Sequence, residues 1–487
     1  MNKKYLISLL LCSFLICISA FFFTACNEQT NDNNQNNTPT PSEGLEFTIN
    51  EEQTGYSVTG IGSCSDNDVV IPNTYLGKPV TEIKEQAFKQ NESITSVYIP
   101  NSVTKIEHHA FFLCSSLTSI NIPYGVKSIE KYTFFECNSL IDISIPNTVS
   151  EIGNHAFFAC VSLPTITIPT GVKIIQGSAF NICRSLTNLS IPNTVTTIEQ
   201  EAFSGCTSLE SIVIPNSVTN IEAEAFSYCS SLKTITLPNN ITQIAGQCFS
   251  NCTSLNNIEI PNSVTKIDYM AFQDCSSLKS INIPESVTDI GNYTFYKCKS
   301  LTSLSIPKNV TNIGAYTFSG CSSLANFSIS EDNANYTIID GNLYTKDQKT
   351  LLYYSASKPA SAAIIPNGVT AISDSAFHLC TSLTSVTLPN SITTIGSNAF
   401  SQSSITSIII PDSVNYIGEY AFHHCPMLTS ITIPNATDIK WSALSNCPML
   451  STIKFNGTVE EWANRFYYIE NVAATKIICN DGDFILD

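Results

Sequence analysis

The sequence predicts a mostly β solenoid of about 15–16 turns, each built from one 23-residue unit. Three residue types repeat with this period. Ten cysteines stand 23 residues apart from Cys114 to Cys321, as do ten prolines from Pro100 to Pro307 and eleven phenylalanines from Phe88 to Phe318. Such a period is typical of units that stack in one direction, because no single unit can bury its own apolar face.

One clean unit runs from Cys206 to Cys229, and its general form is C-x-S-L-x-x-I-x-I-P-x-x-V-x-x-I-x-x-x-A-F-x-x-C. The I-x-I-P segment alternates apolar residues with others, which favours a short strand. Proline ends that strand because it has no N–H to donate to a ladder. The V-x-x-I-x-x-x-A-F segment then returns apolar side chains beneath the strand. We therefore expect one long parallel sheet, with about 16 strands between Ile94 and Leu450.

The segments L-x-x-I-x-I-P, A-F and the closing Cys resemble the BspA-type, or treponemal-type, leucine-rich repeats over about residues 60 to 480. This resemblance implies a leucine-rich repeat solenoid with irregular turns, terminal caps and a parallel sheet on its concave side. It also implies a non-enzymatic surface lipoprotein that adheres to host matrix proteins or to proteins of other cells.

The start of the chain predicts export and a membrane anchor. Lys3 and Lys4 precede an apolar run from Tyr5 to Phe23, which is typical of a signal peptide. The run ends in F-T-A-C, which resembles a bacterial lipobox with Phe where Leu is usual, so Cys26 is the predicted lipidation site. An uncleaved membrane anchor is the alternative, because the run approaches spanning length. Both interpretations place the protein outside the cytoplasm and at a membrane, and the first places it at the bacterial cell surface.

Composition and period divide the chain into segments. The phenylalanine spacing grows to 59 residues between Phe318 and Phe377, and the Asp340-Gly341 pair between apolar runs favours a hairpin there. The predicted segments are a signal peptide (1–25), a disordered lipid-proximal tether (26–44), an N-terminal cap (45–83), regular repeats (84–329), an enlarged hairpin-containing turn (330–365), further repeats (366–455) and a C-terminal cap (456–487).

The repeated cysteines admit two interpretations. They can be small buried side chains whose S–H groups donate weakly to the backbone. Alternatively, neighbouring units can form disulfides, because stacked equivalents lie near the required Cα separation. Every position in the ladder is equivalent, so no pairing is specified. Asn91 and Ser403 occupy the cysteine position in two units, which favours packing.

Charge and motifs argue against several functions. The chain has 23 basic and 40 acidic residues and a net charge of −17, which disfavours nucleic acid and anionic lipid surfaces as partners. Hydrolase, metalloprotease, phosphate-loop and dinucleotide motifs are missing from the sequence. The adjacent pairs His108-His109 and His423-His424 are expected to diverge. We therefore predict no catalytic residue, no cofactor and no metal site.

Two surfaces are candidates for binding. Outward positions of the predicted strands carry mostly short polar side chains, which lack the aromatic and Arg anchors of binding hot spots. Aromatic residues gather instead in two columns near the A-F segment. These columns are second-layer packing on the convex side or a partner-binding patch, and the binding hypothesis rests on Phe112, Phe135, Phe158, His109, Tyr132 and His155. Polysaccharide binding, in the envelope or diet, and a structural coat role are the alternative functions.

Overall fold

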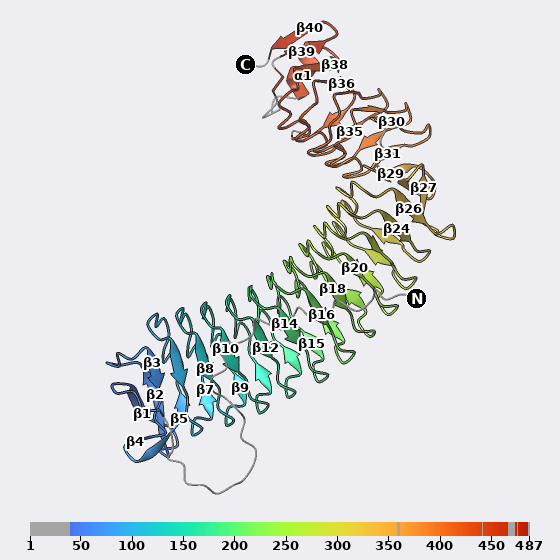
Figure 1. Cartoon of the computed structure of the whole chain (residues 1–487). Helices are drawn as coiled ribbons and strands as arrows, with labels where there is room; N and C mark the ends of the chain where they lie inside the picture. The colour runs from blue at the N-terminus through green and yellow to red at the C-terminus, as the bar shows by residue number, and fades with distance from the viewer. Residues whose placement is uncertain (1–38, 358–360, 441, 466–472, 475, 486–487) are drawn as a thin grey trace, which may run out of the picture. The chain divides into compact units, whose positions relative to one another are not determined.

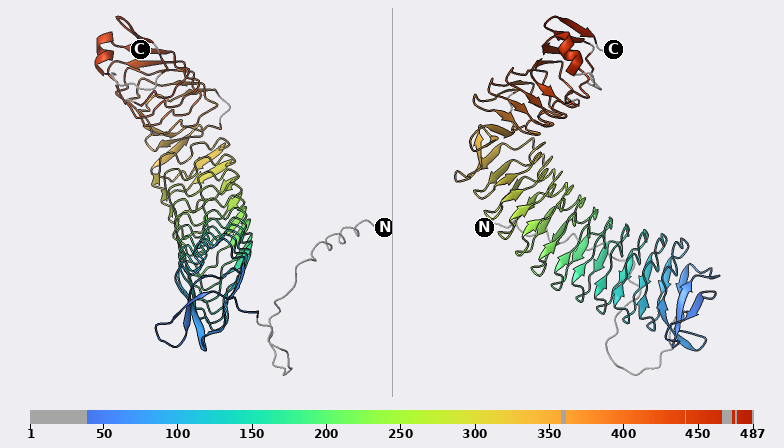
Figure 2. Two further views of the ribbon diagram at one scale, coloured as in Figure 1. Left: turned by 90° about the vertical axis from the view of Figure 1, so that its left-hand side faces the viewer. Right: turned by 180° about the vertical axis from the view of Figure 1, so that it is seen from behind.

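The computed structural model describes residues 39–357, 361–440, 442–465, 473–474 and 476–485, and every structural statement below refers to these residues. Residues Pro41–Asp487 form one compact unit. Successive coils stack on one another in chain order, as the colour gradient in Figure 1 and the two further views in Figure 2 show. The fold is therefore a β-solenoid, as the sequence predicts.

Each coil contributes one short strand at its L-x-x-I-x-I segment, and we call these strands the first column. Neighbours pair in parallel with a shift of one unit, so that Ser211 lies opposite Thr234. Sixteen of its strands follow the repeated apolar positions from Ile94 to Leu450, in agreement with the prediction, and the terminal segments add β3 and β39. The column comprises β3 (Asp68–Val70), β6 (Ser96–Tyr98), β8 (Ser119–Asn121), β10 (Asp142–Ser144), β12 (Thr165–Thr167), β14 (Asn188–Ser190), β16 (Ser211–Val213), β18 (Thr234–Thr236), β20 (Asn257–Ile258), β22 (Ser280–Ile281), β24 (Ser303–Ile306), β26 (Asn326–Ile329), β30 (Ala362–Ile364), β32 (Ser385–Thr387), β34 (Ser407–Ile409), β36 (Ser430–Pro434), β38 (Thr452–Asn456) and β39 (Lys476–Cys479).

The V-x-x-I segment forms a second column of parallel strands, which the sequence does not predict. Its strands are mostly two residues long, with the isoleucine buried and the preceding residue outward. The column comprises β5 (Lys78–Ile83), β7 (Lys105–Ile106), β9 (Ser128–Ile129), β11 (Glu151–Ile152), β13 (Ile174–Ile175), β15 (Thr197–Ile198), β17 (Asn220–Ile221), β19 (Gln243–Ile244), β21 (Lys266–Ile267), β23 (Asp289–Ile290), β25 (Asn312–Ile313), β29 (Thr350–Tyr353), β31 (Ala371–Ile372), β33 (Thr394–Ile395), β35 (Tyr416–Ile417) and β37 (Asp438–Ile439).

The prediction of one continuous sheet is wrong. The first column is divided into five sheets, whose strands run from β3 to β10, β12 to β14, β16 to β20, β22 to β26 and β30 to β39; the last sheet also contains the edge strand β40 (Gly482–Ile485). The strands are short, and a pair such as β22–β24 aligns only two residues on each side. Because so few ladder bonds hold each pair, a small local irregularity is enough to end a sheet.

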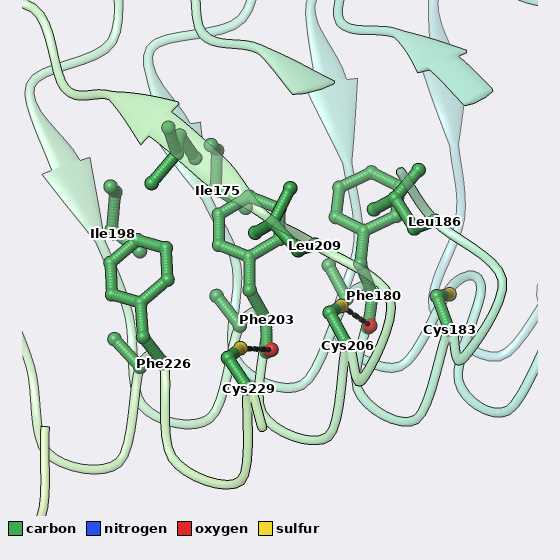
Figure 3. Close-up of a cluster of buried hydrophobic side chains, with 14 of the residues drawn as sticks. Ile175, Phe180, Cys183, Leu186, Ile198, Phe203, Cys206, Leu209, Phe226 and Cys229 are labelled. Atoms are coloured by element: carbon green, nitrogen blue, oxygen red, sulfur yellow. Dashed lines mark hydrogen bonds between the residues drawn. The ribbon is translucent and has the colours of Figure 1, made fainter. Parts of the chain in front are cut away.

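The core consists of side-chain columns that run along the solenoid. Phe88 and its ten equivalents through Phe318 stack with ring centroids 5.2 to 6.1 Å apart. The repeated Leu, Ile, Val and Ala residues pack around these rings and are almost completely buried. Figure 3 shows four neighbouring coils of this core.

The cysteine ladder is reduced and hydrogen bonded in the described residues, which confirms the packing interpretation. In each regular coil the Sγ–H donates to the carbonyl oxygen of the core Phe in the preceding coil. For Cys206 and Phe180 the Sγ–O distance is 3.3 Å, and for Cys229 and Phe203 it is 3.2 Å (Figure 3). Burial raises the pKa of the Cys183 and Cys229 thiols to about 12. The ladder is thus built of neutral, shielded thiols.

All repeating ladders are interrupted between β26 and β30. In this interval β27 (Tyr336–Ile339) and β28 (Asn342–Thr345) form an antiparallel hairpin around Asp340-Gly341, and both turn residues have positive φ, 50° and 73°. This turn geometry is the one that Asp-Gly favours in two-residue hairpins. The strand β29 then pairs antiparallel with β28 and parallel with β31.

The core is divided at the same place. Buried residues before the hairpin form one hydrophobic cluster and those after it form a second. Leu343 and Tyr353 belong to the first cluster, whereas Tyr344 and Leu351 belong to the second. The two repeat blocks therefore meet through the hairpin and a few side-chain bonds, such as the one from the Tyr316 N–H to Ser375 Oγ at 2.9 Å.

Irregular elements lie at both ends of the array. At the N-terminal end, β1 (Glu46–Ile49) pairs antiparallel with β2 (Tyr56–Gly60), β2 pairs parallel with β5, and β4 (Thr74–Tyr75) pairs antiparallel with β5. At the C-terminal end the helix α1 (Val459–Arg465) precedes the β39–β40 hairpin, in which β40 is Gly482–Ile485. Trp462 of α1 is 2% exposed and contacts Phe455 edge-on, so it covers the end of the second core.

Candidate functional site

The A-F segment forms a third repeating ladder, and it sets the direction of the aromatic side chains. In one coil the N–H groups of His109, Phe111 and Leu113 donate to carbonyl oxygens of the next coil at 3.3, 3.0 and 2.8 Å. Alternate N–H groups bond within the coil, as Phe112 does to His109 O at 3.1 Å. This pattern requires two left-handed residues per coil, here His109 with φ of 59° and Leu113 with φ of 61°.

The left-handed positions recur in every regular coil and are mostly not glycine. The residue before the repeated Ala or Thr has a positive φ in ten successive coils, from His109 to Tyr316. Three of the predicted binding residues, His109, Tyr132 and His155, occupy this position. Sequence analysis missed this conformation because only Gly205 and Gly320, at the other left-handed position, signal it.

The structure brings the six predicted aromatic residues together. Phe112, Phe135 and Phe158 form one stack, with ring centroids 4.8 and 4.7 Å apart and interplanar angles of 12° and 5°. A parallel stack of His109, Tyr132 and His155 has centroid separations of 4.8 Å throughout. Within a coil the two stacks touch, because the His109 and Phe112 rings are 5.2 Å apart. We call this two-column cluster the aromatic ribbon.

The aromatic ribbon is half-buried and neutral. All six side chains are of intermediate exposure. Burial lowers the pKa of His155, and burial together with the neighbouring His108 lowers the pKa of His109. At one end of the ribbon the Lys89 ammonium lies 5.6 Å from the Phe112 ring centroid. At the other end the column continues with Asn181, which donates to Glu201 at 2.9 Å.

The expectation that His108 and His109 diverge is wrong. Their Nδ1 atoms lie 2.9 Å apart, and the Nε2 atom of His108 lies 3.4 Å from Glu85 Oε2. The left-handed backbone at His109 is the physical reason, because it abolishes the alternation that extended neighbours show. Glu85, His108 and His109 therefore form a cluster that the sequence analysis did not identify.

The outward face of the first column is polar, as predicted, with a few apolar exceptions. In strands such as β12, β16 and β18, the side chains on either side of the central isoleucine are exposed. Val213 is 66% exposed on this face, and two residues of the second block, Ile364 and Ile409, are 80% and 72% exposed. Both isoleucines occupy the outward position that Val213 has in its coil, so the repeat register after the enlarged turn is the sequence signal that locates them.

A second aromatic cluster spans the enlarged turn. Tyr293 and Tyr316 stack at 4.4 Å, and His378 of the second block lies edge-on to Tyr316 at 5.2 Å. Burial lowers the pKa of His378 to about 4. The pairing of Tyr316 with His378 links the two repeat blocks through side chains where the β-ladders stop.

The predicted anchor lies outside the described part of the chain. The signal peptide and the lipidation site Cys26 belong to residues 1–38, of which the structure describes none. Within the residues that are described, no helix combines the length and apolar character needed to cross a bilayer.

These features define the class of the protein. Each regular coil turns a Leu and two Ile of its L-x-x-I-x-I segment inward and polar residues outward, and stacks on its neighbour one unit away. This arrangement is that of a leucine-rich repeat solenoid, a fold that generally binds proteins over a repeated surface and is generally non-catalytic.

The sequence comparison identifies the family. A profile of the BspA type leucine rich repeat region matches residues 60–187, 174–288, 242–351 and 349–472. The chain therefore belongs to the BspA-type leucine-rich repeat family. No curated protein sequence matches it.

Several solved structures are similar to this chain. A leucine-rich repeat protein from Bacteroides ovatus is 28% identical with a TM-score of 0.52, over 91% of this chain and 100% of that one. A leucine rich cell surface protein from Faecalibacterium prausnitzii is 26% identical with a TM-score of 0.37, over 89% of this chain and 98% of that one. The pneumococcal vaccine antigen PcpA is 19% identical with a TM-score of 0.35, over 86% of this chain and 82% of that one. The Bacteroides match supports the solenoid fold.

Proposed function

We propose that this protein is exported, anchored by a lipid on Cys26 at the bacterial surface, and binds proteins of the host matrix or of other cells through the aromatic ribbon. The single observation that carries the binding proposal is the ribbon itself. Six aromatic rings from three coils stack in two adjoining columns and remain half-exposed. Rigid aromatic anchors of this kind dominate binding hot spots, because they offer large contact area at small entropic cost.

Packing alone does not require aromatic residues at these positions. The position of Phe112 is occupied by Ser204, Ser227 and Ser250 in later coils, where the backbone ladder is the same. Those serines are 9%, 1% and 3% exposed, and the first two hydrogen bond to one another at 2.8 Å. A coil of this fold is thus complete with serine here, and three consecutive phenylalanines add exposed apolar surface that the fold does not need.

Serine substitution supplies a clean test. The variant Phe112→Ser/Phe135→Ser/Phe158→Ser introduces the residue that other coils carry at the same position. The fragment 41–487 is suitable for the assay because it contains the whole compact unit. Binding is measured against immobilised matrix and plasma proteins and against a glycan array. We expect at least one protein ligand for the unsubstituted fragment and at least tenfold weaker binding by the variant, equivalent to about 1.4 kcal/mol.

A matched control replaces apolar residues on the other candidate face. The variant Val213→Ser/Ile364→Ser/Ile409→Ser removes the exposed apolar side chains of the first column. It should bind as the unsubstituted fragment does. If this control loses binding and the ribbon variant does not, the binding site lies on the outward face of the first column and not on the aromatic ribbon. Binding to glycans alone would support the polysaccharide alternative, and binding to no protein in the panel contradicts recognition of proteins.

The anchor has a separate test. Metabolic labelling with a fatty acid should modify the full chain in a bacterial host and should not modify the Cys26→Ala variant. Equal labelling of both proteins excludes Cys26 as the lipidation site.

A further inference from the structure

The geometry points to a binding site for a divalent transition metal, of the Zn²⁺ class, formed by Glu85, His108 and His109. One candidate ligand atom from each of these residues lies within 4.8 Å of the other two. Two imidazole nitrogens and a carboxylate oxygen are a ligand set that suits Zn²⁺ and similar borderline cations. The site adjoins the aromatic ribbon and shares His109 with it.

The distances suit one ion. Zn–N bonds are about 2.0–2.1 Å, so two nitrogens at tetrahedral positions stand about 3.3 Å apart. The Nδ1 atoms of His108 and His109 are 2.9 Å apart, and opening this gap by a few tenths of an ångström allows both to face one cation. Glu85 supplies the third ligand from a 46% exposed side chain that can swing toward the ion. Solvent access leaves water for the fourth position.

The repeat itself brings the ligands together. Glu85 is one 23-residue unit before His108, so the two residues occupy the same column of neighbouring coils. Later coils place Lys131, Asn154 and Gly177 in that column, and none of these reproduces the carboxylate–imidazole pair. His109 joins the pair because its positive φ turns its ring toward His108.

Surrounding groups hold the ligands in place. The His109 ring is stacked on Tyr132 at 4.8 Å and an interplanar angle of 15°. The Glu85 N–H donates to Glu107 Oε2 at 3.0 Å, which fixes the backbone at Glu85. Contacts outside the first coordination sphere orient metal ligands in this way and raise affinity.

Two of the nearby cations, Lys84 and Lys89, are engaged elsewhere. Lys84 is paired with Glu82 at 2.9 Å and with Glu107 at 3.3 Å. The Lys89 ammonium lies over the Phe112 ring and within 3.3 Å of Gln86 Oε1. Their charges are therefore partly compensated, which reduces their repulsion of a bound cation.

Calorimetric titration of the fragment 41–487 with ZnCl₂ tests the proposal. We expect one Zn²⁺ per chain, and at least tenfold weaker binding in each of Glu85→Gln, His108→Gln and His109→Asn. Asn is chosen at residue 109 because it tolerates a positive φ, which protects the fold. The control is His423→Asn/His424→Asn, since this second adjacent pair also has a left-handed residue at His424, but His423 directs its Nδ1 to Ser445 Oγ at 2.8 Å.

Footprinting locates the ion independently of affinity. Zn²⁺ should protect His108 and His109 from diethyl pyrocarbonate, read by peptide mass spectrometry, and leave His423 and His424 reactive. The proposal is overturned if no Zn²⁺ binds up to millimolar concentration, if the three ligand variants bind as tightly as the unsubstituted fragment, or if protection appears at other residues only.

Discussion

Replacing Phe226 with Ala should loosen the first repeat block and leave the block beyond the enlarged turn intact. The ring of Phe226 is completely buried and stacks between Phe203 and Phe249, with centroids 5.5 and 6.0 Å away. In a solenoid each coil is stabilised only by its neighbours, so the damage should spread through adjoining coils. It should stop where the ladders and the core are both interrupted, between β26 and β30.

The size of the effect follows from this environment. A buried Phe→Ala change typically costs about 3–5 kcal/mol, which includes the cavity that remains. Two stacking contacts, each worth about 0.5–1.5 kcal/mol, are lost here as well. Backbone ladders on both sides of the coil oppose collapse into the gap, so we expect the upper part of the range, about 4–5 kcal/mol. A loss of about 4 kcal/mol raises the local opening equilibrium about a thousandfold.

Hydrogen exchange read by mass spectrometry measures this opening coil by coil. In the Phe226→Ala fragment, amides near residues 203–249 should exchange up to about a thousandfold faster. Amides of the second block, residues 377–433, should exchange as before. The matched variant Phe400→Ala, whose ring is also completely buried and stacks on Phe377 and Phe422 at 4.6 and 5.1 Å, should give the reverse pattern.

Two results would refute this reasoning. Equal acceleration in both blocks for either variant would mean that the solenoid opens as one cooperative unit, despite its divided core. No acceleration near residue 226 would mean that the phenylalanine column does not hold adjacent coils together.

Three further predictions follow from single positions. Burial lowers the pKa of His378 to about 4, whereas an unfolded His titrates near 6.5, so the unfolded state binds the proton first and stability should fall as pH drops from about 6.5 to about 4. Urea midpoints measured at several pH values should show this loss of stability, and the loss should be smaller in the His378→Ser variant. An identical pH profile for the two proteins contradicts the prediction. Alkylation at pH 8 should label the half-exposed Cys64 and spare buried thiols such as Cys183 until denaturant is added, and early labelling of the ladder would count against its burial. Glu136→Gly should stabilise the protein by about 1 kcal/mol, because its φ of 53° is left-handed and glycine already occupies the equivalent Gly320; a lower melting temperature would speak against strain there.

Much of the fold could be predicted because a repeat multiplies weak signals. A single I-x-I-P segment is ambiguous, but its recurrence in stacked coils, with small variations, establishes the strand, its inward residues and its register. The same multiplication predicts the cysteine ladder. Its one enlarged interval predicts the site of the hairpin at Asp340-Gly341. The six aromatic residues of the ribbon were also found this way, because equal spacing along the chain becomes proximity in a solenoid.

The sequence by itself determined the period, the class of fold, the buried columns and the positions where aromatic residues align. Only the tertiary structure decided the second strand column, the separation of the core into two clusters, and the convergence of Glu85, His108 and His109. The physical reason is that apolar spacing reports which side of the chain is buried, whereas it carries no information on the sign of φ. The left-handed backbone at His109 is held by the hydrogen bond that its N–H donates to the next coil, and such a bond exists only once the coils have stacked.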